Sequence, residues 1–292
     1  MKISEFEEKE YESPLYNQLE RETNLIWSPG QCFEHFIGID RSFCINDRMF
    51  HKMGFNRYYP GIFLSHYNWN YIWFLRRKKK LLPPFRLNLF IQSKRPFFGR
   101  APKYGFKKRC YRFDILISQQ KVLEKVANNL KNKALLIYAA PIFHTQKELY
   151  NYTINNTIIE NSTFPEIMQL QGHVSWYYDS VRNGIGCSEP EKIFIKPLHQ
   201  RLEEFIYSQK LSEIDELKKD YLYELSSTII KTLKNQDNDY FELQSIFFNR
   251  LLEFENNLKY YEIEDNYMAD FKNFFTIVIF TEVFNLDWFV LG

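Results

Sequence analysis

The segment that most constrains this fold is an eight-residue run over 134–141, ALLIYAAP, which contains no charged residue. Such a run is typical of a strand that is buried on both faces of a sheet. A helix is predicted before it, over 118–131, because apolar residues recur at helical spacing and Ser118 is a suitable N-cap. A further strand is predicted over 111–117. The order of strand, helix and strand indicates an α/β fold with a mixed sheet.

The chain upstream adds a helix and two more strands to this unit. The acidic segment 4–22 predicts a helix, and 36–45 follows a turn and predicts a strand. The sequence RLNLFIQSK over 86–94 alternates in polarity, as a strand does, and the proline after it ends the strand. A loop is expected over 97–108. The segment 47–84 is irregular, aromatic and basic, so it is expected to be an insertion.

The second half of the chain is predicted to be mixed at first and then helical. Residues 142–196 are rich in loop signals, with a turn near Gly184, and helical patterns run from residue 197 almost to the end. The apolar tail 271–291 is interrupted by charged residues, so it predicts a buried helix rather than a membrane span. We therefore expect an α/β domain over 1–196 and a C-terminal helical domain over 197–292.

Positive charge is concentrated in one stretch, although the net charge of the chain is only +2. Residues 48–113 contain 17 Lys and Arg and no Asp or Glu, and aromatic residues are interleaved with them. Cations release counterions from phosphates and aromatic rings stack on bases, so this mixture favours contact with nucleic acid. The expected contact residues are Arg76, Arg77, Lys78, Lys79, Lys80, Lys107, Lys108 and Arg109.

The cysteines and the N-terminal segment favour a cytoplasmic protein. The chain has four cysteines, and none of them forms the close pairs of a zinc site or of a disulfide framework. The N-terminal segment is acidic and lacks the apolar stretch of a secretory signal. Both features predict a reducing compartment and no membrane partner.

Three polar side chains are expected to meet at one edge of the sheet. Asp40 lies on one predicted strand, and Gln92 and Lys94 lie at the end of another, where residues two apart share a face. Asp40 and the amide oxygen of Gln92 are suitable ligands for Mg²⁺ or Mn²⁺, and the carbonyl of Ser93 is a further candidate. Lys94 would activate the attacking water and offset charge at the scissile phosphate. A metal and a lysine together predict phosphodiester hydrolysis.

These elements resemble the PD-(D/E)xK nuclease superfamily, the restriction-endonuclease-like proteins, in a Gln-x-Lys variant. The resemblance covers about residues 1–145 and rests on the helix over 4–22, on Gly38-Ile39-Asp40, on Gln92-Ser93-Lys94 and on the helix and strand that follow. It implies a core of helix, three strands, helix and strand. It also implies metal-dependent cleavage of DNA, in restriction or antiviral defence.

Two features depart from the family pattern. Gln92 stands where an acid is more usual, which removes a negative charge from the metal site. The resemblance implies that a glutamate of the first helix supplies it, and Glu12 and Glu20, about two turns apart, are the favoured candidates; Glu34 is a third. The long gap between Asp40 and Gln92 is explained by the insertion, which would lie beside the site.

The sequence thus predicts a Mg²⁺-dependent endonuclease, a hydrolase that acts on DNA and is restrained by a regulatory protein or a second copy bound to its acidic C-terminal helices. One alternative is a non-catalytic nucleic-acid-binding protein with a degenerate site. Another is an adaptor that uses the basic segment on a protein or an anionic membrane. The residue pattern is compatible with DNA and with RNA.

Overall fold

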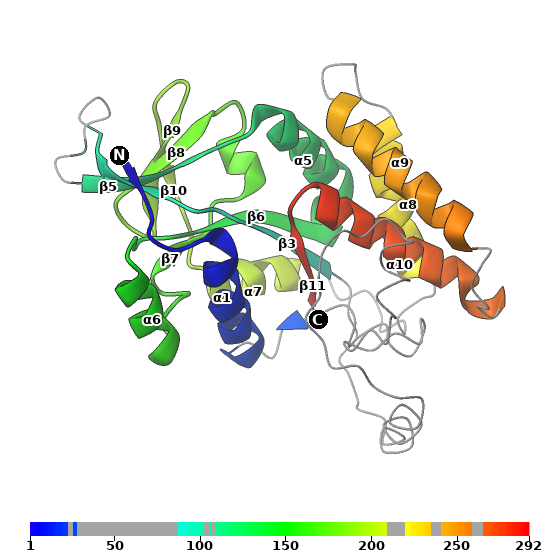
Figure 1. The fold of residues 1–292 in the computed structure, drawn as a ribbon, viewed down its shortest axis with the longest axis horizontal. Coiled ribbons are helices and arrows are strands. Elements are labelled where there is room, and N and C mark those ends of the chain that lie inside the picture. Colours follow the sequence, from blue (N-terminus) through cyan, green and yellow to red (C-terminus); the bar gives the residue numbers. More distant parts are fainter. Residues whose placement is uncertain are drawn as a thin grey trace.

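The computed structural model shows a mixed α/β protein with two sheets (Figure 1). It describes residues 1–22, 26–27, 87–101, 106, 109–208, 220–234, 241–258 and 265–291. The strand expected over 36–45 and the insertion expected over 47–84 lie outside the described residues. None of the helices within those ranges is long and apolar enough to cross a membrane.

One sheet forms the centre of the fold. Its order is β2 (Ile26–Trp27), β11 (Asp287–Leu291), β3 (Leu87–Ser93), β6 (Ala134–Pro141) and β7 (Ser162–Thr163). β3 pairs with β6 in parallel and with β11 in antiparallel orientation. Every residue of β3 and β6 is buried, because helices cover both faces of these strands.

The second sheet is antiparallel and lies at one end of the molecule. Its order is β1 (Lys2–Ile3), β4 (Phe97–Arg100), β5 (Arg109–Asp114), β8 (Ser175–Tyr178), β9 (Asn183–Cys187) and β10 (Glu191–Phe194). Only three residues separate β3 from β4, so the chain passes directly from the central sheet into this one.

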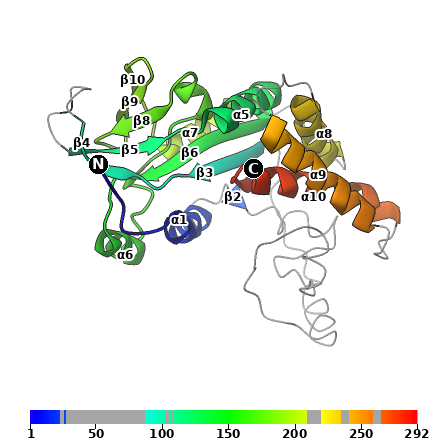
Figure 2. The same ribbon diagram turned by 45° about the horizontal axis from the view of Figure 1, so that its top comes forward.

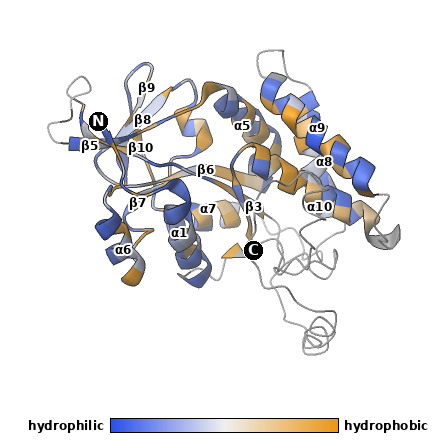
Figure 3. Ribbon diagram, viewed as in Figure 1, coloured by the Kyte–Doolittle hydropathy of each residue, from blue (hydrophilic) through white to orange (hydrophobic). Residues whose placement is uncertain are grey.

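Helices pack on the two faces of the central sheet (Figures 1 and 2). One face carries α1 (Glu8–Glu22), α6 (Gln146–Ile154) and α7 (Leu198–Ser208). The other carries α5 (Ile117–Leu130), α8 (Asp220–Lys234), α9 (Phe241–Leu258) and α10 (Asp265–Val283). Short 3-10 helices cover Lys131–Lys133 and Ile167–Leu170. Hydrophobic and hydrophilic residues occur together along these helices, as expected for helices with one buried side (Figure 3).

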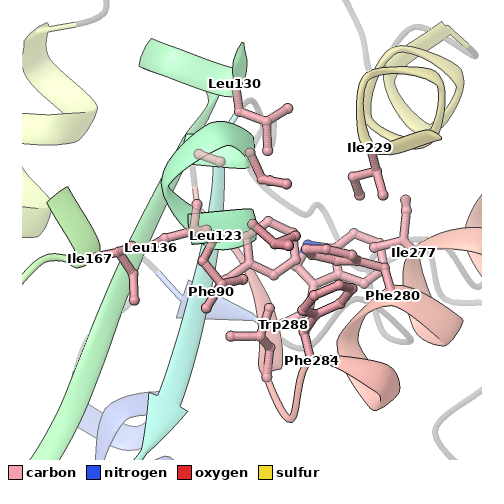
Figure 4. Close-up of a cluster of buried hydrophobic side chains, with 14 of the residues drawn as sticks. Phe90, Leu123, Leu130, Leu136, Ile167, Ile229, Ile277, Phe280, Phe284 and Trp288 are labelled. Atoms are coloured by element: carbon pink, nitrogen blue, oxygen red, sulfur yellow. The ribbon is translucent and has the colours of Figure 1, made fainter. Parts of the chain in front are cut away.

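The alternation of residues along β3 divides the core into two clusters. Leu89 and Ile91 pack with α1, α6 and α7, whereas Phe90 packs with α5, α8 and α10. Figure 4 shows side chains of this second cluster, which come from β3, α5, α8, α10 and β11. They include Phe90, Leu123, Ile229, Phe280 and Trp288. Large aromatic side chains dominate this cluster, and each contributes a large buried apolar area.

The C-terminal helices share this core with the sheet. The cluster around Phe90 contains residues of α8, α9 and α10 as well as residues of α5 and β6. The last described strand, β11, pairs with β3 itself. The boundary expected between residues 196 and 197 therefore does not separate two hydrophobic cores.

The predicted helix over 118–131 and the predicted strand over 134–141 are confirmed within one residue. The apolar tail was expected to be helical to its end, and that prediction is wrong. α10 ends at Val283, Asn285 adopts a positive φ of 48°, and the chain continues as β11. Asn tolerates this backbone region, and the alternating aromatic and β-branched residues that follow suit a strand.

Three local expectations are also wrong. α5 starts at Ile117, and its N-cap is Leu116 without a side-chain hydrogen bond, so Ser118 does not cap it. The first part of the loop expected after residue 96 is β4, because it pairs with β5. Gly184 lies in β9 rather than in a turn, with the buried ring of Trp176 where a Cβ would be.

Replacing Gly184 by alanine is expected to destabilise the protein. A Cβ at this position would lie 2.2 Å from Cζ2 of Trp176, whose side chain is fully buried and so has no free space to move into. Overpacking of this kind typically costs about 1–3 kcal/mol. Thermal unfolding should show a lower Tm for Gly184→Ala and an unchanged Tm for the exposed control Ser188→Ala. Equal Tm values for the two variants would contradict this packing.

Candidate functional site

The candidate site lies where β3 ends. The backbone N–H of Lys94 donates to the carbonyl of Ala139 at 2.8 Å, which continues the pairing of β3 with β6 by one residue. Its Nζ lies 5.4 Å from the centroid of the Tyr138 ring. Burial lowers the pKa of Lys94, and the negative charge of Glu8 partly opposes this shift. The lysine named by the sequence motif is thus held against the sheet, near a carboxylate of the first helix.

Helix α1 is docked at this strand end by side chains spaced four residues apart. Glu8, Glu12 and Tyr16 share one face of the helix because of this spacing. The Tyr16 hydroxyl donates to Oδ2 of Asp287 at 2.8 Å and lies 3.0 Å from the Ser93 hydroxyl oxygen. Nδ2 of Asn285 donates to Oε1 of Glu8 at 2.9 Å. The helix therefore joins the end of β3 to the beginning of β11.

Glu12 is the most perturbed carboxylate at this junction. It is 5% exposed, and Lys9 forms an ion pair with it. Burial raises the pKa of Glu12 to about 7; the nearby charge of Asp287 adds to this rise, and Lys9 opposes it. Burial and the charge of Asp287 both disfavour the ionised form of Glu12. A nearby cation would favour that form.

The side chain of Gln92 points to the face of the sheet opposite α1. Its side chain is 1% exposed, and its Nε2 donates to the carbonyl of Phe284 at 3.1 Å. Gln119 of α5 donates to the same carbonyl. Gln92 therefore lies on the α5 and α10 face of the sheet, whereas Ser93 faces α1. Oε1 of Gln92 is buried and has no hydrogen-bond partner in the described part of the structure.

The structure places two of the predicted site residues near the end of β3. Lys94 lies over the ring of Tyr138 on the face that Gln92 shares, whereas Glu12 belongs to α1 on the face of Ser93; the charge of Glu8 influences the pKa of both. Glu20 is eight residues beyond Glu12 on α1, which corresponds to about 12 Å along the helix, and it lies away from this end. Asp40 and Glu34 lie outside the described residues.

Of the predicted nucleic-acid contacts, the structure describes one. Arg109 is exposed at the start of β5, and its guanidinium lies 5.8 Å from the centroid of the Phe98 ring. The remaining contacts lie outside the described residues: Arg76, Arg77, Lys78, Lys79, Lys80, Lys107 and Lys108.

Sequence reasoning missed Asp287 and Tyr16. Asp287 opens the strand that was expected to be part of a helix, so no local pattern placed it beside β3. Tyr16 follows Glu12 by four residues, and this spacing was the available signal, because it puts both side chains on one helix face. Together they add a second carboxylate and a hydroxyl to the site.

The oxygen ligands at this junction suit a hard divalent cation in type. Glu12 and Asp287 offer carboxylate oxygens, the ligands that Mg²⁺ prefers in proteins. Among the residues that the structure describes, no group of three or more His, Cys, Asp and Glu is arranged to hold a metal ion. A cation here would therefore need an additional ligand, and Asp40 is the one that the sequence predicts.

Comparisons of this chain with protein-family models, with curated proteins and with solved structures find no match.

The raised pKa of Glu12 predicts a specific dependence of stability on pH. The native state binds this proton more tightly than the unfolded chain, whose carboxyl has the ordinary value of 4.5. Stability from this group is thus fully present at low pH and is lost as the pH rises from about 4.5 through about 7. Glu12→Gln stays neutral, so its Tm relative to wild type should increase between pH 5 and pH 8.

Thermal unfolding across this pH range provides the measurement. Glu20→Gln removes a carboxylate from the same helix away from Asp287, and it should keep the wild-type dependence on pH. If the Tm difference between Glu12→Gln and wild type were constant over the range, the burial of an ionising Glu12 would be refuted.

Proposed function

We propose that this protein is a metal-dependent nuclease that hydrolyses phosphodiester bonds of DNA, with Glu12, Asp40 and Lys94 at its active site. The observation that carries the proposal is the position of Glu12. A buried carboxylate of the first helix lies at the strand end that presents Lys94, and Glu8 is close enough to shift the pKa of both. Perturbed carboxyl and lysine groups at one place are a feature of functional sites.

The residues have distinct roles in this proposal. Glu12 and Asp40 would hold a divalent cation, Mg²⁺ or Mn²⁺, which supplies an activated water and stabilises charge on the phosphate when bound. Lys94 would contact a non-bridging phosphate oxygen and offset the negative charge that develops there. Its lowered pKa supports an alternative role, because a larger fraction of the amine is then unprotonated near neutral pH and able to take a proton from the attacking water.

Asp287 and Tyr16 would position Glu12 rather than contact the substrate. The hydroxyl of Tyr16 neutralises part of the charge of Asp287 by donating to it. Asp287 in turn raises the pKa of Glu12 and so increases the advantage of a bound cation. Gln92 has no metal contact in this proposal, because its amide donates to the carbonyl of Phe284 on the face of the sheet opposite α1.

A second candidate function is nucleic-acid binding without cleavage. The observation in its favour is the amide of Gln92, which is directed to the carbonyl of Phe284 on the face opposite α1. In this case the metal site would be incomplete and the basic segment alone would determine the activity. Metal-dependent cleavage separates the two candidates.

The proposal includes restraint by a regulatory protein or a second copy at the C-terminal helices. Exposed apolar side chains on α8 and α9 support this part. Tyr223 is 60% exposed and Leu252 is 57% exposed. A role in restriction or antiviral defence, in the cytoplasm, completes the proposal.

Nicking of supercoiled plasmid with Mg²⁺ or Mn²⁺ tests the enzyme. We expect wild type to nick, and Lys94→Ala, Asp40→Ala and Glu12→Gln to lose at least about 100-fold in rate, the usual cost of removing a group that stabilises the transition state. Glu20→Gln is the matched control on α1 and should retain activity. Equal loss in Glu12→Gln and Glu20→Gln would remove Glu12 from the site.

The absence of cleavage by wild type with either metal, together with intact binding of DNA that weakens with salt, would favour the second candidate. Cleavage that persists in Lys94→Ala would place the catalytic lysine elsewhere.

A further inference from the structure

A β-hairpin follows directly after the strand end that carries Lys94. β4 begins three residues after this lysine and pairs with β5 in antiparallel register. Figures 1 and 2 place β4 and β5 at the end of the molecule remote from α8, α9 and α10. The hairpin is therefore an extension of the candidate site, on the side away from the acidic helices.

Two arginines face each other across this hairpin. Arg100 pairs with Arg109 in the β4–β5 register, and both side chains are exposed. Like charges directly opposite on neighbouring strands are destabilising. Neither arginine forms an ion pair with an acid in the described part of the chain, so their charge is available to an external anion.

Further cations lie on the same face of the hairpin or follow in its sequence. Phe98 precedes Arg100 by two residues and pairs with Lys2 of β1, so Lys2 shares this face with both arginines. Lys2 is exposed. Between the two arginines the sequence adds Lys103, Lys107 and Lys108 and no acid.

Neighbouring arginines that have structural roles provide a contrast. Arg95 forms an ion pair with Glu7 at 2.8 Å, and Arg112 forms one with Asp114 at 3.0 Å. Both are thereby neutralised by the protein itself. Arg100 and Arg109 are left as the two exposed cations of the described hairpin without such a carboxylate.

An aromatic group supports Arg109. Its guanidinium lies 5.8 Å from the centroid of the Phe98 ring, and that ring stacks on His144 with a centroid distance of 4.0 Å. A cation over an aromatic face is held electrostatically. Arg109 is thus partly ordered before any ligand binds, which lowers the entropic cost of a contact.

We propose that the β4–β5 hairpin is a DNA-binding arm, in which Arg100 and Arg109 together contact the phosphate backbone. Guanidinium groups form bidentate hydrogen bonds with phosphate oxygens, and two adjacent groups would contact one or two phosphates. Arg100 is six residues from Lys94, at most about 20 Å of extended chain, so a strand bound here would also reach the site. Only this last step rests on the proposed function; binding by the arm does not.

Binding of a fluorescent DNA duplex to the full-length protein tests the arm. All measurements use the Lys94→Ala background, so that cleavage does not interfere, over a salt series. We expect Arg100→Gln/Arg109→Gln to weaken binding at least about tenfold at low salt and to reduce the slope of log K against log salt by about 2, as two lost phosphate contacts require. Arg100→Lys/Arg109→Lys should restore most of the affinity.

The matched control is Arg182→Gln/Lys192→Gln, which removes two exposed cations near the opposite edge of the same sheet. It should bind DNA as the background protein does. Equal weakening in both double variants would overturn the proposal, as would the absence of any binding to DNA. So would arginine-dependent binding to phosphatidylserine vesicles without binding to DNA, because the partner would then be a membrane.

The two proposals fail in different ways. If plasmid nicking is absent but the arginine variant loses DNA binding, the arm stands and the nuclease does not. If nicking depends on Lys94 but the arginine variant binds DNA normally, the nuclease stands and the arm does not.

Discussion

The burial of β3 on both of its faces is the constraint on which the rest of this structure depends. Odd and even positions of one strand supply two separate cores, and β6 and β11 flank the strand. A strand held in this way has little freedom to shift in register, because a slip of one residue would exchange its two faces. The residue that follows it, Lys94, is therefore presented from a rigid support.

The candidate site differs from the rest of this support in its polarity. Glu12 and Lys94 both have pKa values shifted towards neutrality by burial, and in each case burial is the largest cause. The charged forms of both side chains would be better solvated in water, yet both side chains lie at the end of a hydrophobic sheet. Retaining such groups costs stability, which supports the view that the junction has a function beyond packing.

Local sequence patterns predicted the parts of the fold that depend on local interactions. The helix over 118–131 and the strand over 134–141 have clear periodicity, and both are confirmed. The direction of Gln92 and the position of Asp287 depend instead on which helix covers which face and on pairing between distant segments. One example is the indole N–H of Trp288, which donates to Asn88, 200 positions away in the sequence. The composition of the apolar tail alone suits a buried helix equally well, so it did not reveal this strand. Asp40, the remaining predicted ligand, lies outside the described residues.

The pairing of β3 with β11 also bears on how the protein is made. Until Asp287–Leu291 has been synthesised, one edge of β3 has no partner from β11, and unpaired edges of apolar strands are prone to aggregation. The ribosome takes roughly 10 to 40 s to add the intervening residues at about 5–20 per second. During that interval Glu12 lacks Asp287, so the junction assembles only after residue 287 has emerged.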